Sequence, residues 1–326
     1  VAGFDRYFQL SPCFRDEDSR ADRSPGEFYQ IDFEMSFVTQ NEIFAVGEEL
    51  MTDLFHKFAP SAKVSAAPFV HISFAESMLT YGTDKPDLRN PLIIQDVSEI
   101  FAGSDFGLFA NTIATGGFVR AIRTPATATK PRSWFDKMND FAVAQEMGGL
   151  GYITFAAEGP KGPIAKKLDA ERLEKLFQIN GAQTGDSVFF VCGKGDKVVK
   201  FAGLVRTMLG QELNLIEQNA FRFCWITDFP FYERDEETGA PAFSHNPFSM
   251  PQGEIQALLN QDPFTIKAYQ FDMVCNGYEI LSGAIRNHRP DIMFKAFEIA
   301  GYGPEVVREK FAGLLNAFQY GAPPHG

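Results

Sequence analysis

CFRDEDSRADRSPGEF, residues Cys13–Phe28, places an arginine at the end of one strand-like segment and an aromatic residue at the start of the next. Strand-like patterns cover residues 4–15 and 27–38, so the charged run between them is expected to be the loop of a hairpin. In the second segment, apolar and polar residues alternate, which predicts one apolar and one polar face. The polar face carries Gln30, Asp32, Glu34 and Ser36, and the apolar face carries Ile31, Phe33, Met35 and Phe37. We interpret the polar row as the wall of a polar cavity.

The rest of the chain predicts an antiparallel sheet that is interrupted by an inserted domain and then resumes. A helix capped by Asn41 is expected to run to Phe58 and to end at Pro60. A turn-rich linker at 82–91 leads to a separate αβ unit, strands resume at 221–230 and 269–286, and helices follow near 292–300 and 304–317. The predicted fold class is α+β, with domains at 1–89, 90–215 and 216–326. No glycine-rich phosphate loop follows a strand, so any nucleotide must be held in another way.

Composition narrows the class of protein. The chain has 326 residues, 45% hydrophobic and 22% charged, which suits about two ordinary domains. No run approaches the roughly 20 apolar residues that a membrane span needs. Its four cysteines are scattered, which argues against a disulfide framework or a zinc site and fits a reducing cytoplasm. The net charge of −12 is the wrong sign for bulk attraction to nucleic acid, so a nucleic-acid ligand requires basic residues gathered locally, as in the lysine-rich stretch 161–206.

A second hairpin is predicted around Asn276-Gly277, the favoured two-residue turn. Pairing across this turn sets Val274 opposite Glu279, so Asp272 and Glu279 lie diagonally on one face and repel unless a cation sits between them. A solvated acidic hairpin is the competing interpretation. Arg286 lies seven residues after Glu279. Because this number is odd, the two side chains would point to opposite faces of a regular strand.

The segment Cys13–Phe28 resembles motif 2 of class II aminoacyl-tRNA synthetases, in the form found in bacterial aspartyl-tRNA synthetases. A surface hairpin laced with salt bridges is what the charge run alone would otherwise indicate. The resemblance implies that Arg15 binds the ATP α-phosphate and the aspartate carboxylate, that Asp16 and Glu17 bind ATP, and that Phe28 stacks on adenine. Relatives often have a shorter Gln-Pro-Glu where this chain has Ser-Pro-Gly-Glu at 24–27, so no ATP contact is assigned to a glutamine here.

The same resemblance implies an aspartate pocket. Gln30 and Asp32 would surround the substrate ammonium, and His245, in Ser-His-Asn-Pro-Phe at 244–248, would belong to the family's histidine loop. Arg286 would grip the side-chain carboxylate of aspartate. Because of its odd step from Glu279, we predict a bulge or irregularity near Ser282-Gly283 that restores its direction.

Further implied ligands are a metal ion and tRNA. Asp272 and Glu279 would hold the Mg²⁺ that accompanies ATP, with Glu279 also serving the nucleotide. Arg20 and Arg23, in the motif-2 loop, would face the acceptor end of tRNA. The unit at roughly 90–215 resembles the domain that bacterial aspartyl-tRNA synthetases share with part of a tRNA-dependent amidotransferase, and no catalytic constellation is visible in it.

The implied function is a ligase that activates aspartate with ATP to aspartyl-adenylate and transfers it to tRNA(Asp), with tRNA(Asn) as an open second acceptor. The family's homodimeric, cytoplasmic enzyme also has an anticodon-binding domain, a motif 1 and a motif 3. None of these is recognised in this chain, which opens without methionine, so we expect a fragment that is inactive by itself. A non-catalytic paralogue is the main alternative, but Arg15, Glu17, Asp272, Glu279 and Arg286 are all retained. An asparaginyl- or lysyl-type enzyme fits less well because Arg286 suits an anionic side chain.

Overall fold

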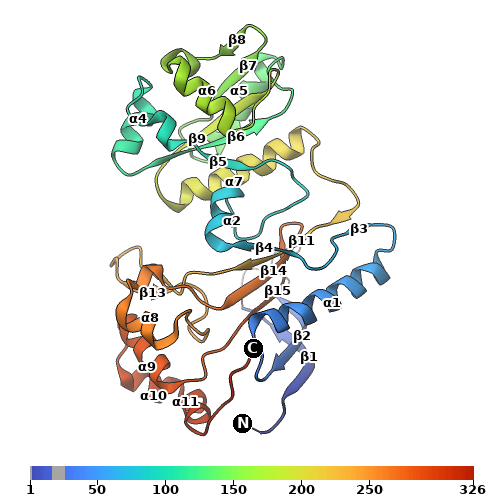
Figure 1. Cartoon of the computed structure of the whole chain (residues 1–326), viewed down its shortest axis with the longest axis vertical. Helices are drawn as coiled ribbons and strands as arrows, with labels where there is room; N and C mark the ends of the chain where they lie inside the picture. Colours follow the sequence, from blue (N-terminus) through green and yellow to red (C-terminus); the bar gives the residue numbers. More distant parts are fainter. Residues whose placement is uncertain (1, 17–25) are drawn as a thin grey trace. The chain divides into compact units, whose positions relative to one another are not determined.

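The computed structural model describes residues 2–16 and 26–326 (Figure 1). The chain forms two compact units: Val1–Phe74 with Phe221–Gly326, and Ala75–Ala220. The second unit therefore interrupts the first in the sequence, and the expected borders near 90 and 215 lie inside it. Helices and antiparallel sheets occur together, which confirms the predicted α+β class.

The first unit begins with the expected hairpin, β1 (Arg6–Phe14) and β2 (Glu27–Met35), paired antiparallel with Phe14 opposite Glu27. Strand β2 ends at Met35, because Phe37 takes a positive φ of 58° and is exposed. The predicted apolar face is thus only partly buried: Met35 lies in the core, whereas Ile31 is 50% exposed. Other apolar side chains of the hairpin are also exposed, namely Phe8, Leu10, Phe14 and Tyr29.

Helix α1 (Gln40–Phe58) follows, and its N-cap is Thr39 rather than the predicted Asn41. The physical reason is Glu42, whose carboxylate accepts the Thr39 backbone N–H at 2.7 Å and so satisfies a donor that the helix leaves open. This contact also lowers the pKa of Glu42. The helix ends at Phe58, as predicted, just before Pro60.

A four-stranded sheet in the order β15-β14-β11-β4 forms the centre of this unit. Its strands are β4 (Val70–Ser73), β11 (Phe223–Thr227), β14 (Gln270–Cys275) and β15 (Tyr278–Ala284). Strand β4 runs parallel to β11, and the other pairs are antiparallel. One face packs on α1, where Phe44 stacks on Trp225 at 4.3 Å and meets Phe271 edge-on. The opposite face carries Asp272 and is therefore the face available for a site.

A helical layer completes the first unit. Buried side chains from α8 (Glu254–Asn260), α9 (Pro290–Ile299), α10 (Pro304–Lys310) and α11 (Ala312–Gln319) form its cores. Figure 1 shows these helices together, in orange and red. Shorter elements are β3 (Lys63–Val64), β10 (Ala220–Phe221), β12 (Tyr232–Arg234), β13 (Pro241–Phe243) and the 3₁₀ turn η2 (Pro263–Thr265).

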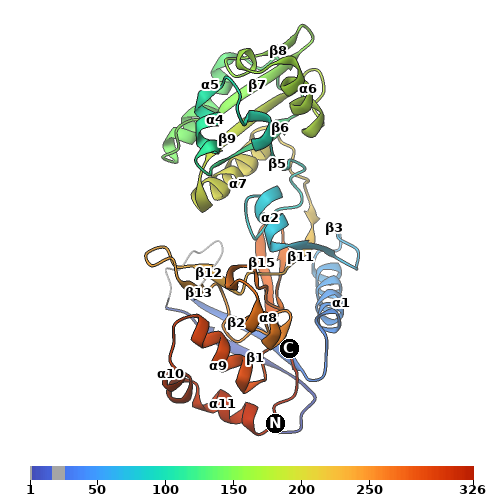
Figure 2. The same ribbon diagram turned by 60° about the vertical axis from the view of Figure 1, so that its left-hand side comes forward.

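The second unit is built on a five-stranded antiparallel sheet in the order β5-β6-β9-β7-β8 (Figure 2). A hydrophobic core lies on each face of this sheet. Its strands are β5 (Ile94–Asp96), β6 (Phe118–Thr124), β7 (Gly151–Ala156), β8 (Gly159–Lys161) and β9 (Ser187–Gly193). Its helices are α2 (Phe74–Thr80), α3 (Ser98–Phe101), α4 (Gly107–Ala114), α5 (Arg132–Ala144), η1 (Ala165–Lys167), α6 (Ala170–Ile179) and α7 (Gly195–Glu212).

A buried arginine ties the turn-rich linker to α7. Arg206 is 2% exposed, and its guanidinium donates to the carbonyls of Leu92, Asp87 and Asn90. Burial lowers its pKa to about 10, so the side chain stays charged at neutral pH. Among the described residues, no helix is both long and apolar enough to cross a membrane.

Candidate functional site

The polar face of the first hairpin holds two of the predicted aspartate contacts in a row. Asp32 lies opposite Gln9, whose amide donates to its carboxylate at 2.7 Å. Gln30 lies opposite Ser11, and its Oε1 accepts the Cys13 thiol at 3.5 Å. Because cross-strand partners share a face, these side chains point to one side of the hairpin. Their present contacts are within the hairpin, so a ligand would compete with them.

Arg15 is placed at the end of this row by its backbone. Its N–H donates to Gly26 O at 2.9 Å, which continues the β1–β2 pairing by one step beyond the strands. Its guanidinium carbon lies 5.2 Å from the centre of the Phe28 ring, a cation–π contact. The arginine predicted for phosphate and the ring predicted for adenine are thus neighbours, and one face of that ring is occupied. Asp16 is exposed, while Glu17, Arg20 and Arg23 lie outside the described residues.

The second hairpin has the predicted pairing. Val274 lies opposite Glu279, and Asp272 lies opposite Ser282. The register shifts between Met273 and Val274, since Met273 pairs with Leu281, so Ile280 is an extra residue on β15. This bulge makes the step from Glu279 to Ser282 bring both side chains to the face of Asp272.

The predicted irregularity therefore exists, and it lies at Ile280, two residues before the Ser282-Gly283 pair near which it was expected. Gly283 has another reason to be glycine: a Cβ there would lie 2.6 Å from the ring of Phe271. Strand β15 ends at Ala284, and Arg286 beyond it bridges Ser249 instead of continuing the pairing with β14.

The two acidic side chains differ in environment. Asp272 is 4% exposed, whereas Glu279 is exposed. On one face and diagonal to each other, their carboxylates offer two oxygen ligands, with Asp272 supplying the rigid one. Within the described ranges 2–16 and 26–326, no group of three or more His, Cys, Asp and Glu side chains could hold a metal ion unaided. Such a pair suits a cation that takes its other ligands from phosphate and water.

The histidine loop is anchored beside Arg286. Met250 N–H donates to Ile285 O and Asn287 N–H donates to Phe248 O, each at 2.8 Å. Between these bonds, Ser249 and Arg286 form an antiparallel bridge. Arg286 Nε is buried, and it has no hydrogen-bond partner among the residues that the structure describes.

His245 itself stands between two aromatic rings, at 5.1 Å from Phe229 and 6.1 Å from Phe74. The following Asn246 shapes the loop. Its side-chain oxygen accepts Phe248 N–H at 2.9 Å, and its carbonyl accepts Ser249 N–H at 3.3 Å. Asn246 thus closes a turn that presents His245 to solvent.

The C-terminal segment links the first hairpin to the second. His325 bridges Ser36 next to β2, and its carbonyl accepts Arg286 N–H at 2.8 Å. Gly326 exchanges backbone hydrogen bonds with Met35 at 3.0 and 2.7 Å. The row of Gln30 and Asp32 and the segment of Arg286 are therefore tied to the same short stretch of chain.

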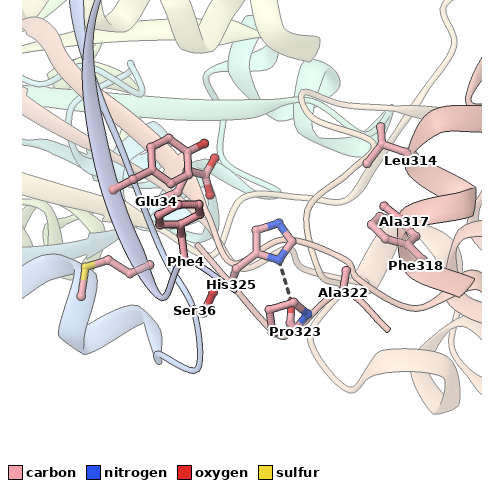
Figure 3. A pocket seen from close by; sticks show the side chains of 11 residues that line it. Phe4, Glu34, Ser36, Leu314, Ala317, Phe318, Ala322, Pro323 and His325 are labelled. Carbon is pink, nitrogen blue, oxygen red and sulfur yellow. Dashed lines mark hydrogen bonds between the residues drawn. The ribbon is translucent and has the colours of Figure 1, made fainter. Parts of the chain in front are cut away.

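A pocket of about 280 Å³ opens beside this stretch (Figure 3). His325, whose Nδ1 lies 2.8 Å from Pro323 O, and Glu34 line it together with Phe318 of α11. Of the predicted site residues that the structure describes, none lines this pocket. Glu34 extends the polar row. Burial raises the pKa of Tyr7, and the negative charges of Glu34 and Asp32 raise it further.

Two residues near the site escaped sequence reasoning. Asp228, after β11, takes a positive φ of 58° and accepts the Gln252 amide at 2.7 Å, which ties β11 to the end of the histidine loop. Ser249 is fully buried. Proximity of Ser249 to the His245 motif was the only available signal, and none pointed to Asp228.

The lysine-rich stretch does not act as one free basic surface. Lys175 pairs with Glu171 at 2.7 Å and Lys197 with Glu146 at 3.5 Å. Lys166 and Lys167 line a polar pocket of about 260 Å³ in the second unit, where Arg172 is bound by Asp169. Part of the positive charge is thus neutralised locally.

Comparisons with known proteins identify the family to which the chain belongs. The family model described as tRNA synthetases class II (D, K and N) matches residues 1–326. An aspartate–tRNA(Asp/Asn) ligase of Gluconobacter oxydans is 62% identical over all of this chain and 55% of its own length. Those of Acidiphilium cryptum and Paramagnetospirillum magneticum are 63% and 62% identical, over 55% and 37% of their lengths. The chain thus spans about half, or less, of these relatives.

Among solved structures, an aspartyl-tRNA synthetase of Entamoeba histolytica is similar over 98% of this chain and 42% of its own, with 16% identity and a TM-score of 0.40. The family assignment does not depend on that likeness. It depends on the sequence match, which runs through both hairpins and the histidine loop. The chain belongs to the class II tRNA synthetases of the D, K and N type.

Proposed function

We propose that the protein containing this chain activates aspartate with ATP and transfers the aspartyl group to tRNA(Asp) and tRNA(Asn). One observation carries the proposal: the bulge at Ile280 puts Glu279 on the face that holds Asp272, and Arg286 follows two residues after β15 ends at Ala284. The pair of carboxylates suits a nucleotide-bound cation, and the guanidinium of Arg286, whose Nε is buried, suits an anionic side chain. The names of the relatives support both acceptor tRNAs.

In this proposal, Arg286 binds the side-chain carboxylate of aspartate. The guanidinium fork matches a carboxylate and leaves an amide imperfectly paired, so Arg286 favours aspartate over asparagine. Gln30 and Asp32 receive the ammonium from the polar row, and His245 closes the pocket from its loop.

Arg15 receives the α-phosphate of ATP together with the reacting carboxylate. Asp16, Glu17 and Glu279 contribute to nucleotide binding, and adenine stacks on Phe28. Because Arg15 already covers one face of that ring, the base takes the other face or displaces the guanidinium. Asp272 and Glu279 would hold Mg²⁺, which supplies charge neutralisation for the phosphates when bound.

The chemistry requires no side-chain nucleophile. The α-carboxylate of aspartate attacks the α-phosphorus and pyrophosphate leaves, after which the terminal ribose of tRNA attacks the adenylate. The chain's residues accelerate the first step by holding the reactants in line and by placing the charge of Arg15 where negative charge develops. Arg20 and Arg23 would contact the acceptor end of tRNA.

Three further features complete the proposal. The second unit, Ala75–Ala220, contains the region around 90–215 that corresponds to the inserted domain of the bacterial enzymes. The intact enzyme is a homodimer. Its location is the cytoplasm, whose reducing conditions suit the four free cysteines.

Aspartate-dependent exchange of pyrophosphate into ATP by the intact protein tests the function. Wild type should exchange with aspartate and not with asparagine. Arg286→Gln should reduce kcat/KM for aspartate at least 100-fold, because it removes a buried charge-assisted contact. The matched control is Arg308→Gln on α10, whose guanidinium lies over the Phe294 ring of α9; its kcat/KM should be unchanged. Exchange that requires another amino acid would refute the proposal.

A further inference from the structure

Ser249 and Arg286 face each other across a two-segment ladder. Their bridge lies between the hydrogen bonds Met250 N to Ile285 O and Asn287 N to Phe248 O, so they form a non-hydrogen-bonded antiparallel pair. In such pairs the Cα atoms are only about 4.5 Å apart and the side chains leave the same face. The Ser249 side chain therefore starts beside that of Arg286.

Both side chains carry a buried polar atom whose hydrogen bond is not made. Ser249 is 0% exposed and its Oγ has no partner, and Arg286 Nε has none either, within the part of the chain that the structure describes. A hydroxyl oxygen accepts and Nε–H donates, so the two atoms are complementary. Buried groups left in this way are rare in native proteins because they lose hydration without compensation.

We infer that Ser249 is a positioning residue for Arg286: its hydroxyl accepts the Nε–H when the two terminal amino groups of the guanidinium engage a ligand carboxylate. The inference rests on the proposed function, in which that carboxylate is the side chain of aspartate. With Nε held from behind, the fork has one orientation, and the ligand does not bear the cost of ordering it. Ser249 thus adjusts specificity for a carboxylate without touching it.

A purely structural role leaves the hydroxyl unexplained. The ladder is made of backbone groups, which alanine would supply equally well. A matched control exists in Ser187 of β9 in the second unit, which is also 0% exposed with an Oγ that lacks a described partner. Ser249→Ala and Ser187→Ala remove the same atom from equally buried sites, and only the first adjoins Arg286.

Pyrophosphate exchange by the intact protein tests the inference. Ser249→Ala should raise KM for aspartate about tenfold, the size expected for one hydrogen bond to a charged group, with KM for ATP and Tm unchanged. Ser187→Ala should leave both KM values unchanged. In an Arg286→Lys background, which lacks Nε–H, adding Ser249→Ala should change nothing further.

An unchanged aspartate KM in Ser249→Ala, or a tenfold effect that persists in the Arg286→Lys background, would overturn the inference and leave the proposed function standing. A wild-type protein that shows no aspartate-dependent exchange would overturn the proposed function, and the inference with it.

Discussion

Glu48→Ala tests how the sheet that carries the site is held to α1. Glu48 is 8% exposed, and its Oε1 accepts two donors at 3.0 Å, the indole N–H of Trp225 and the backbone N–H of Phe69. Both donors are buried, since Trp225 is 0% and Phe69 is 3% exposed. Alanine removes the acceptor and gives neither donor access to water.

The expected loss of stability follows from the number of buried donors, which is two. Leaving a buried donor unsatisfied costs about 1–3 kcal/mol, so two donors cost about 2–6 kcal/mol. Removing a buried carboxylate recovers part of this, which leaves a net loss of about 3 kcal/mol in the free energy of unfolding. Glu48→Gln retains an acceptor oxygen for both donors and should cost about 1 kcal/mol or less. Glu49→Ala, at the exposed neighbouring position of the same helix, should be nearly neutral.

Urea unfolding followed by tryptophan fluorescence measures these values. The chain has two tryptophans, one in each unit, so a Trp134→Phe background leaves Trp225 to report on the first unit alone. The slope of free energy against urea should stay constant while the midpoint moves. Equal midpoints for Glu48→Ala and Glu48→Gln would show that the two hydrogen bonds contribute nothing, and would refute this reasoning.

Three other predictions concern both units. Gly82→Ala should destabilise the second unit by about 2 kcal/mol or more, read from Trp134 fluorescence, because φ is +70° and a Cβ would lie 2.4 Å from the backbone nitrogen of Gly203; an unchanged midpoint would contradict this. Burial and, to a smaller extent, the neighbouring Cys275 raise the pKa of the Cys224 thiol to about 12. Because the thiol of the unfolded chain ionises first, the free energy of unfolding should fall as pH rises from about 9 to 12, and Cys224→Ala should make this fall less steep. Asp228→Ala should cost about 1–2 kcal/mol in urea unfolding, whereas Asp228→Asn, which keeps an acceptor for Gln252 and tolerates a positive φ, should be nearly neutral.

The sequence by itself determined the local parts of this protein. The alternation along β2 and the Asn276-Gly277 turn, with φ values of 54° and 87°, predict two hairpins and the pairing of Val274 with Glu279. These features depend on residues within a few positions of one another, and side-chain periodicity and turn chemistry record such relations directly. The family resemblance then supplied roles for the side chains.

Tertiary structure alone decided how these parts meet. The bulge lies at Ile280, and Gly283 admits the ring of Phe271, a residue on the neighbouring strand. Ser249 faces Arg286, and the C-terminal segment joins β2 to the same arginine, through backbone bonds between segments far apart in the chain. A backbone hydrogen bond can be made by almost any residue, so no pattern of side chains in the sequence specifies which distant segments it joins.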